Sequence, residues 1–132
     1  MQLNSVLIIE DDDELRRQIA AGFEAAGYEV RTAEDGLIGL NAFKAAPTDL
    51  VVTDIYMPNR EGVETIIALR EVSASVKIIA VSGSFRVAPG TILNVARGVG
   101  ADATLAKPFR RAILIELAAD LLNPPPSASA AA

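Results

Sequence analysis

The chain has 132 residues, of which 51% are hydrophobic, and a formal net charge of −5. This size and composition are typical of one ordinary domain with a substantial core. It contains no Cys and no His, which excludes disulfides, zinc–thiolate sites, imidazole nucleophile pairs and imidazole metal sites. The negative charge and the absence of an apolar run near about 20 residues lead us to expect a cytoplasmic protein that binds neither nucleic acid nor membrane.

Five short apolar runs, rich in Val and Ile, are predicted to be strands. Several are continuous rather than alternating, which indicates strands buried on both faces of a parallel sheet. In chain order these predicted strands are residues 5–9, 28–33, 49–54, 76–82 and 102–106.

Segments with helical spacing separate and follow the strands. The first carries Leu15, Ile19, Phe23 and Ala26 on one stripe and is followed by Gly27, which we expect to cap the helix. The remaining predicted helices are about residues 35–46, 62–72, 89–98, with Pro89 as its first residue, and 110–122.

Strand–helix alternation, repeated five times, predicts an α/β fold with a parallel sheet. We assign residues 1–123 to this domain. The Pro/Ala/Ser tail, residues 124–132, is expected to be disordered because its composition cannot form a core.

Polar side chains stand where four of the predicted strands end. Glu10 and Asp11 follow the first strand, Asp54 ends the third, Ser82 ends the fourth and Lys107 follows the fifth. Ligands of open parallel sheets bind at the carboxyl ends of the strands. We therefore expect these three acids, the hydroxyl and the lysine to meet at one edge of the sheet.

The acidic run from residue 10 to residue 14 has two interpretations. Acids in a first helical turn favour the helix dipole, and Asp12 could be the N-cap. Alternatively, its first two acids join Asp54 in a site. Two carboxylates about 5 Å apart repel by roughly 3 kcal/mol at an effective dielectric near 20, so such a cluster needs cations. Lys107 and a hard divalent ion, Mg²⁺, would supply the positive charge.

Three segments of the sequence carry the most specific patterns: LIIEDDDELR, DLVVTDIYMPNREGVE, which is similar to D-x-x-M-P-x-x-x-G, and GADATLAKPF. In this order they resemble the motifs of one family, the receiver domain of bacterial response regulators in two-component signalling. The resemblance covers about residues 4–122. It implies a (βα)5 doubly wound fold with a five-stranded parallel sheet in the flavodoxin-like order 2-1-3-4-5.

The resemblance also implies the roles of the acids. Asp54 would be the phosphoacceptor, taking a phosphoryl group from the phosphohistidine of a sensor histidine kinase or histidine phosphotransfer protein. Asp11 and Asp54 would ligate Mg²⁺ directly together with the backbone carbonyl of Tyr56, and Glu10 would act through water.

Further implied roles fall on the ends of the last two strands and on the first helix. Ser82 would hydrogen-bond the phosphoryl oxygens, and Lys107 would pair with them, aimed by a cis peptide before Pro108. The partner's histidine-bearing helix would dock beside Arg16 and Arg17.

The sequence departs from the family pattern in the region expected to transmit the signal. Thr104 stands where the family usually has Tyr or Phe, and the stretch from 82 to 100 is longer than usual and contains four glycines and a proline. We therefore expect Phe85 and residues 83–98 to respond to phosphorylation while the strand around Thr104 stays still. We expect a single-domain response regulator without a DNA-binding output domain, which signals by altered contact with a protein target that the sequence does not identify.

Three other functional classes are consistent with parts of the pattern. A receiver-like interaction module that works without phosphorylation would be expected to lack an acid, the nucleophile or the lysine. A Mg²⁺-dependent phosphohydrolase of the haloacid dehalogenase type would carry a second Asp two residues after the nucleophile, where Tyr56 stands. A nucleotide-binding fold would need a glycine-rich phosphate motif, and none is present.

Overall fold

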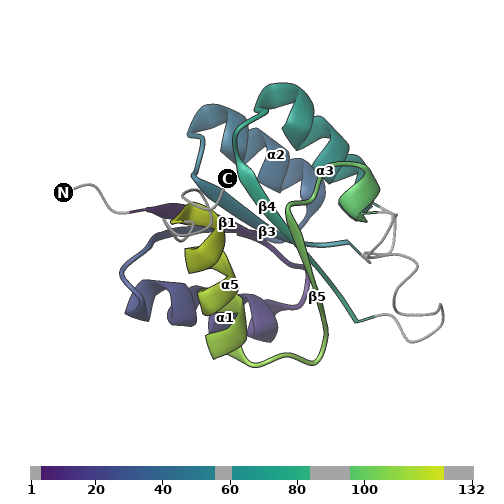
Figure 1. The fold of residues 1–132 in the computed structure, drawn as a ribbon. Helices are drawn as coiled ribbons and strands as arrows, with labels where there is room; N and C mark the ends of the chain where they lie inside the picture. The colour runs from purple at the N-terminus through teal and green to yellow at the C-terminus, as the bar shows by residue number, and fades with distance from the viewer. Residues whose placement is uncertain (1–3, 56–60, 84–95, 124–132) are drawn as a thin grey trace, which may run out of the picture.

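The computed structural model describes residues 4–55, 61–83 and 96–123. These residues form a five-stranded parallel sheet in the order β2-β1-β3-β4-β5 (Figure 1). The strands are β1 (Ser5–Ile9), β2 (Glu29–Ala33), β3 (Leu50–Asp54), β4 (Lys77–Ser82) and β5 (Ala103–Ala106). The doubly wound fold and the strand order expected from the sequence are confirmed.

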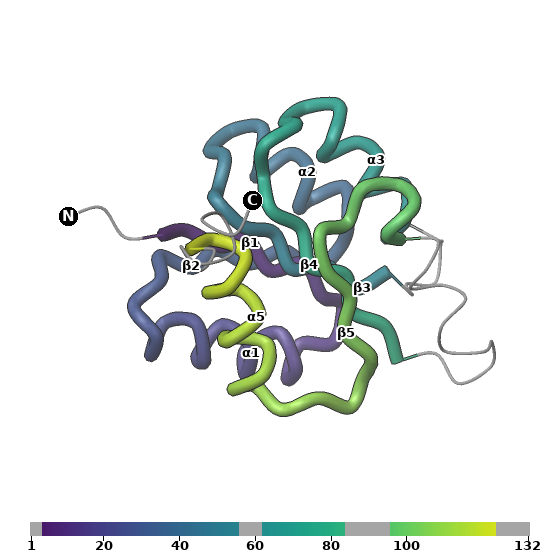
Figure 2. Tube along the Cα trace, in the orientation of Figure 1, coloured from purple at the N-terminus to yellow at the C-terminus, as the bar shows by residue number. Residues whose placement is uncertain are grey.

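Helices cover both faces of this sheet (Figure 1). They are α1 (Asp13–Ala25), α2 (Gly36–Ala45), α3 (Glu61–Val72) and α5 (Arg111–Leu122). The path of the chain in Figure 2 places α2 and α3 on one side and α1 and α5 on the other. Most of the helix predicted at residues 89–98, with its first residue Pro89, lies outside the described residues, although residues 96–98 are helical. Of the helices in the described ranges, none is long and apolar enough to cross a membrane.

Strand alternation divides the core into two layers. In β1, Val6 and Ile8 face α1 and α5, whereas Leu7 and Ile9 face α2 and α3. All four side chains are at most 1% exposed, and burying such a side chain contributes about 1.5–3 kcal/mol. This explains why the strand reads as an unbroken apolar run.

The start of α1 confirms the first interpretation of the acidic run for Asp12, which caps the helix. Asp12 is the N-cap, and its Oδ1 accepts a hydrogen bond of 3.0 Å from the Leu15 amide. Asp35 caps α2 in the same way, through a bond of 2.8 Å from the Ile38 amide. Both helices therefore begin at the carboxyl edge of the sheet, directly after β1 and β2.

The end of α1 differs by one residue from the expectation. Ala26 is the C-cap, and Gly27 lies just beyond it with a φ of 94°, a conformation that glycine adopts without strain. The amides of Gly27 and Tyr28 donate to the carbonyls of Glu24 and Phe23, both at 3.0 Å. The Phe23 and Tyr28 rings also pack edge to face at 4.9 Å. This Schellman arrangement ends the helix and starts the turn into β2.

Candidate functional site

The carboxyl edge of the sheet collects residues from β1, β3, β4 and the turn after β5. These strands are hydrogen-bonded neighbours, and residues 54 and 81 are partners in the register of β3 and β4. Polar groups at their ends therefore share one edge even though they are far apart in the sequence.

Three carboxylates form the centre of the site. One carboxylate oxygen from each of Glu10, Asp11 and Asp54 lies within 4.8 Å of the other two. Glu10 is 1% exposed and Asp54 is 4% exposed, whereas Asp11 is open to solvent. Two buried negative charges at this distance repel strongly, so the cluster requires nearby positive charge.

Lys107 provides one positive charge. Its Nζ donates to Asp54 Oδ2 at 2.7 Å and to Glu10 Oε1 at 2.9 Å. The peptide before Pro108 is cis, and the Lys107 amide donates to the Ser82 carbonyl at 2.8 Å. The lysine is thus fixed at its backbone as well as at its charged end.

The protonation of the site follows from burial and from these ion pairs. Burial, followed by repulsion from Asp54, raises the pKa of Glu10 to about 7. For Lys107, burial opposes the charged form, but hydrogen bonds to Asp54 and Glu10 outweigh it and raise the pKa. Near neutral pH the lysine is therefore charged, whereas Glu10 is only partly ionised.

The Ser82 hydroxyl is a buried polar group in need of a partner. Ser82 is 6% exposed, and its Oγ makes no hydrogen bond within the described part of the chain. Leaving a buried hydroxyl unpaired costs about 1–3 kcal/mol. Its position at the end of β4, beside the strand that ends in Asp54, makes it available to a polar ligand at this edge.

Gly62 brings α3 directly against the strand that carries Asp54. A Cβ at this position would lie 2.2 Å from the Ile55 Cα and 2.7 Å from the Asp54 carbonyl oxygen. Gly62 ends the D-x-x-M-P-x-x-x-G segment, but the sequence alone does not indicate its role. The family motif itself, which ends in glycine, was the available signal.

Gly83 is a second glycine that sequence reasoning did not assign. Its missing Cβ leaves room for the lysine, because a Cβ here would be 3.0 Å from the Lys107 Cδ and 3.1 Å from its Cβ. The aliphatic part of Lys107 therefore packs against bare backbone next to Ser82.

The structure thus places Glu10, Asp11, Asp54 and Lys107 together, with Ser82 at the end of the neighbouring strand. Tyr56 and Phe85 lie outside the described residues. Thr104 lies within β5, where it is partly buried and pairs with Ala80 of β4.

The donor atoms at this edge suit a hard cation. The three clustered groups offer only oxygen ligands, and Asp11 leaves one side of the cluster open to water. Mg²⁺ prefers a few carboxylates together with retained water molecules. The residues present therefore fit the ion that the sequence suggested.

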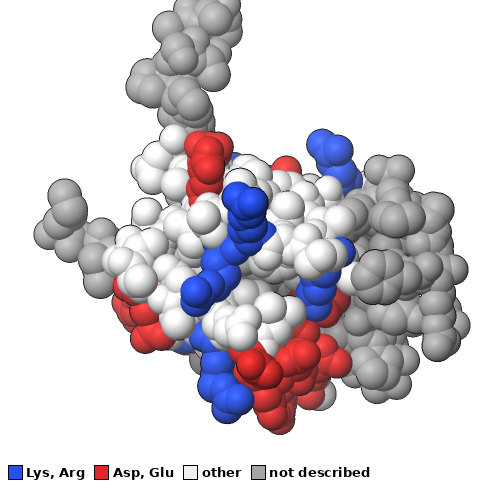
Figure 3. Space-filling model, turned by 90° about the horizontal axis from the view of Figure 1, so that it is seen from below, with Lys and Arg blue, Asp and Glu red and all other residues white. Residues whose placement is uncertain are grey.

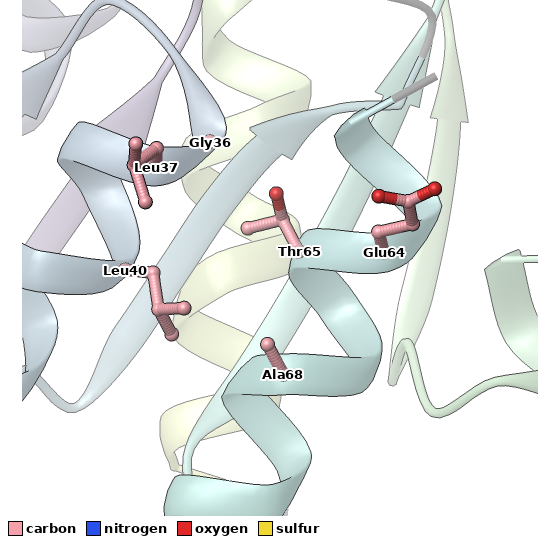
Figure 4. Close-up of a pocket in the computed structure, with 6 residues that line it drawn as sticks. All are labelled: Gly36, Leu37, Leu40, Glu64, Thr65 and Ala68. Atoms are coloured by element: carbon pink, nitrogen blue, oxygen red, sulfur yellow. The ribbon is translucent and has the colours of Figure 1, made fainter. Parts of the chain in front are cut away.

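A groove and a charged patch are two further features of the surface. A groove of about 290 Å³ between α2 and α3 is lined by Gly36, Leu37, Leu40, Glu64, Thr65 and Ala68 (Figure 4), none of which belongs to the acid–lysine site. The face over α1 and α5 shows acidic side chains gathered in one patch with basic side chains beside it (Figure 3).

Fold and site together define the class of protein. A parallel sheet in the order 2-1-3-4-5 carries at its carboxyl edge three carboxylates close enough to share one cation, a lysine and a buried hydroxyl. The chain belongs to the response regulator receiver domain family, whose family model matches residues 6–119.

Individual bacterial relatives agree with this assignment. The transcriptional regulatory protein CseB of Streptomyces avermitilis is 35% identical over 112 residues, covering 83% of this chain and 45% of CseB. The response regulator receiver protein CpdR of Brucella abortus is 32% identical over 108 residues, covering 81% of this chain and 87% of CpdR. The chain therefore spans less than half of CseB but most of CpdR.

A solved structure shows the same fold. The chemotaxis protein CheY4 of Vibrio cholerae superposes with a TM-score of 0.82 at 28% identity, over 92% of this chain and all of CheY4. A receiver domain protein from Clostridium thermocellum gives a TM-score of 0.83 at 25% identity.

Proposed function

We propose that Asp54 accepts a phosphoryl group from the phosphohistidine of a sensor histidine kinase or histidine phosphotransfer protein, in a Mg²⁺-dependent reaction. The phosphorylated domain then signals through altered contact with a protein target. The observation that carries the proposal is the buried Asp54 carboxylate at the end of β3, hydrogen-bonded to Lys107 and clustered with two further acids.

The proposed chemical step transfers phosphorus between two nucleophiles. An oxygen of the Asp54 carboxylate forms a bond to phosphorus while the P–N bond to the partner's imidazole breaks. The imidazole leaves with that electron pair and is protonated, and the aspartate becomes an acyl phosphate. This chemistry requires alignment and charge stabilisation more than covalent help from the protein, which is consistent with a chain that has no His.

Two side chains stabilise the transferred group in this proposal. Lys107, which bonds to Asp54 and Glu10 at 2.7 and 2.9 Å, shifts its hydrogen bonds to the phosphoryl oxygens. The Ser82 hydroxyl donates to one of these oxygens and thereby gains the partner that it lacks among the described residues. Both contacts act on charge that grows as Asp54 goes from −1 toward −2.

Glu10, Asp11 and Asp54 would hold the cation, with Asp11 and Asp54 as direct protein ligands. When bound, Mg²⁺ neutralises the carboxylates and the phosphoryl oxygens as they approach each other. The protein's own contribution is to keep the three acids close together before the donor arrives.

The test is the intact mass of the protein after incubation with acetyl phosphate and Mg²⁺. We expect one phosphoryl adduct, lost in Asp54→Asn. Asp49→Asn is the matched control, because Asp49 is an exposed aspartate just before β3 at the opposite edge of the sheet; it should be labelled like the wild type.

Two other outcomes of this experiment would contradict the proposal. An adduct that persists in Asp54→Asn, or that maps to Ser82, contradicts the assignment of the phosphoacceptor. A wild-type protein that stays unlabelled by acetyl phosphate and by a range of phosphohistidine donors would instead indicate a receiver-like interaction module.

A further inference from the structure

Arg16 turns back from α1 toward the end of β1. Its Nη1 donates to the Glu10 backbone carbonyl at 2.8 Å, and its Nη2 donates to Asp13 Oδ1 at 2.5 Å. The Arg16 side chain is 17% exposed, although its ion-pair partner Asp13 is 68% exposed. The Arg16 guanidinium, on the first two turns of a surface helix, is thus partly buried against the backbone of the site residue Glu10.

The neighbouring arginine behaves differently. Arg17 is exposed, and its side chain makes no hydrogen bond or ion pair with another residue of the described ranges. The sequence suggested one shared role for Arg16 and Arg17 in docking a partner, but their geometry separates them.

Glu10 is fixed through every polar group it has. Its amide donates to the Ala33 carbonyl at 3.1 Å, and its two carboxylate oxygens accept from Lys107 Nζ at 2.9 Å and from the Asp12 amide at 3.2 Å. Arg16 satisfies the remaining group, the carbonyl. That carbonyl belongs to the peptide that joins Glu10 to Asp11, so its orientation fixes where the backbone places both acids.

We infer that Arg16 is a positioning residue for the cation site. Through the Glu10 carbonyl it holds the turn between β1 and α1 in the conformation that directs Glu10 and Asp11 toward Asp54. Mg²⁺ binding requires this fixed placement of the two acids because the ion demands nearly ideal octahedral geometry at short distances, whereas Ca²⁺ tolerates irregular sites. The inference rests on the proposed function only in taking this cluster as the Mg²⁺ site.

A positioning role for Arg16 and simple electrostatics predict opposite effects of its removal on cation affinity. Arg16 carries a positive charge beside an acid cluster, and charge alone would make its removal strengthen cation binding. If Arg16 positions the acids, its removal weakens cation binding despite the more negative field. Groups that orient metal ligands typically contribute 10–100-fold in metal affinity.

The experiment compares Mg²⁺ and Ca²⁺ titrations, followed by NMR amide shifts, in the wild type, Arg16→Gln, Arg16→Lys and Arg17→Gln. We expect Arg16→Gln to bind Mg²⁺ about tenfold more weakly and to lose less affinity for Ca²⁺. Arg17→Gln removes the same charge from the same helix and should bind Mg²⁺ as well as the wild type or slightly better.

Arg16→Lys separates geometry from charge. It keeps the positive charge but lacks the planar fork that reaches two acceptors at once, so we expect Mg²⁺ affinity to fall by a few fold. It also serves if Arg16→Gln does not fold. Thermal melts identify a temperature at which each variant is fully folded, so that lost stability is not mistaken for lost affinity.

Two failures are distinguishable. If the wild type shows no saturable Mg²⁺ binding, the cation site itself is wrong. If the wild type binds Mg²⁺ and the Arg16 variants bind it with equal or higher affinity and an unchanged preference over Ca²⁺, the site stands and Arg16 does not position it.

Discussion

Glu10 is almost completely buried, and its carboxyl group loses its proton at a higher pH than an ordinary glutamate. Its pKa is raised from 4.5 to about 7, first by burial and then by Asp54. In the unfolded chain the same group titrates near its ordinary value, so the folded protein holds the proton over a range in which the unfolded protein has lost it.

This difference predicts a pH dependence of stability in the absence of Mg²⁺. A raised carboxyl pKa stabilises the fold below about pH 4.5, and this contribution is lost as the pH rises toward about 7. We expect the free energy of unfolding of the wild type, relative to Glu10→Gln, to fall by on the order of 1–3 kcal/mol across that range. Urea unfolding of both proteins at several pH values measures it, and a constant difference between them would contradict the raised pKa.

A second prediction at this scale concerns Gly62. In Gly62→Ala the new methyl group would overlap the Ile55 backbone, with 2.2 Å to its Cα. Backbone cannot rotate away as a side chain does, so we expect a loss of about 1–3 kcal/mol and slower labelling of Asp54. Gly98→Ala is the control, because a Cβ there meets nothing within 4 Å. Equal stability of the two variants would show that α3 can shift at no cost.

Sequence reasoning found the acids and the lysine because a strand end fixes where the next residue lies. Glu10, Asp54 and Lys107 each follow or end an apolar run, and the strand-end rule needs nothing more. It did not find the role of Arg16, because a long side chain on a helix can point outward to a partner or back to its own helix start. Only the bond to the Glu10 carbonyl decides between them.

Among the elements, β5 is anchored where it begins. Arg70 of α3 donates to the Gly100 carbonyl at 2.9 Å and to Asp102 Oδ2 at 2.5 Å. The same Asp102 oxygen accepts from the Ile78 amide of β4 at 2.8 Å. Arg70 also bonds to the Val76 carbonyl, so one side chain ties the end of α3 to the starts of β4 and β5.

This anchoring supports the expectation that β5 stays still on phosphorylation. With a beryllofluoride mimic of the phosphoryl group, we expect amide exchange to change at residues 83–98 and to stay nearly constant at 102–106. Thr104, with a small side chain and stiff χ1, can change little buried area.

Arg70→Ala is the informative companion variant. Without its four hydrogen bonds the start of β5 is released, and the mimic should then alter exchange at 102–106 as well. Changes centred on 102–106 in the wild type would show that the signal passes through β5 despite the missing aromatic.

Within the described residues, the strands and helices were the most predictable part of the chain. Each predicted strand agrees with the structure to within one residue at either end, because each short apolar run is bounded by polar or turn residues. The predicted cap of α1 differs from the observed one by one residue, since a glycine can be the cap or the residue after it. Gly27 takes the second position because Phe23 and Tyr28 pack across the turn.

For the whole molecule, the cation site connects local charge to global stability. The folded chain gathers three carboxylates within 4.8 Å, an arrangement that the unfolded chain lacks. A cation that binds this cluster therefore favours the folded state, by about 2.7 kcal/mol at a concentration of one hundred times the Kd.

We expect added Mg²⁺ to raise the melting temperature of the wild type, and a chelator to reverse the increase. Asp11→Asn should show little of this effect. Glu14→Gln, which removes one exposed acid from the first turn of α1, should keep it. An equal increase in all three proteins would indicate general screening of the net charge of −5 rather than a site.

The contacts at the two ends of α3 have a mechanical consequence. At its first turn, Gly62 places backbone against the backbone of residues 54 and 55, and at its last turn Arg70 joins the beginnings of β4 and β5. Its 12 residues span about 18 Å. Closely packed backbone has low compressibility, so α3 acts as a brace of fixed length between the two opposite edges of the sheet. A displacement beside Asp54 can tilt this helix only against the Arg70 contacts that hold the starts of β4 and β5 in place.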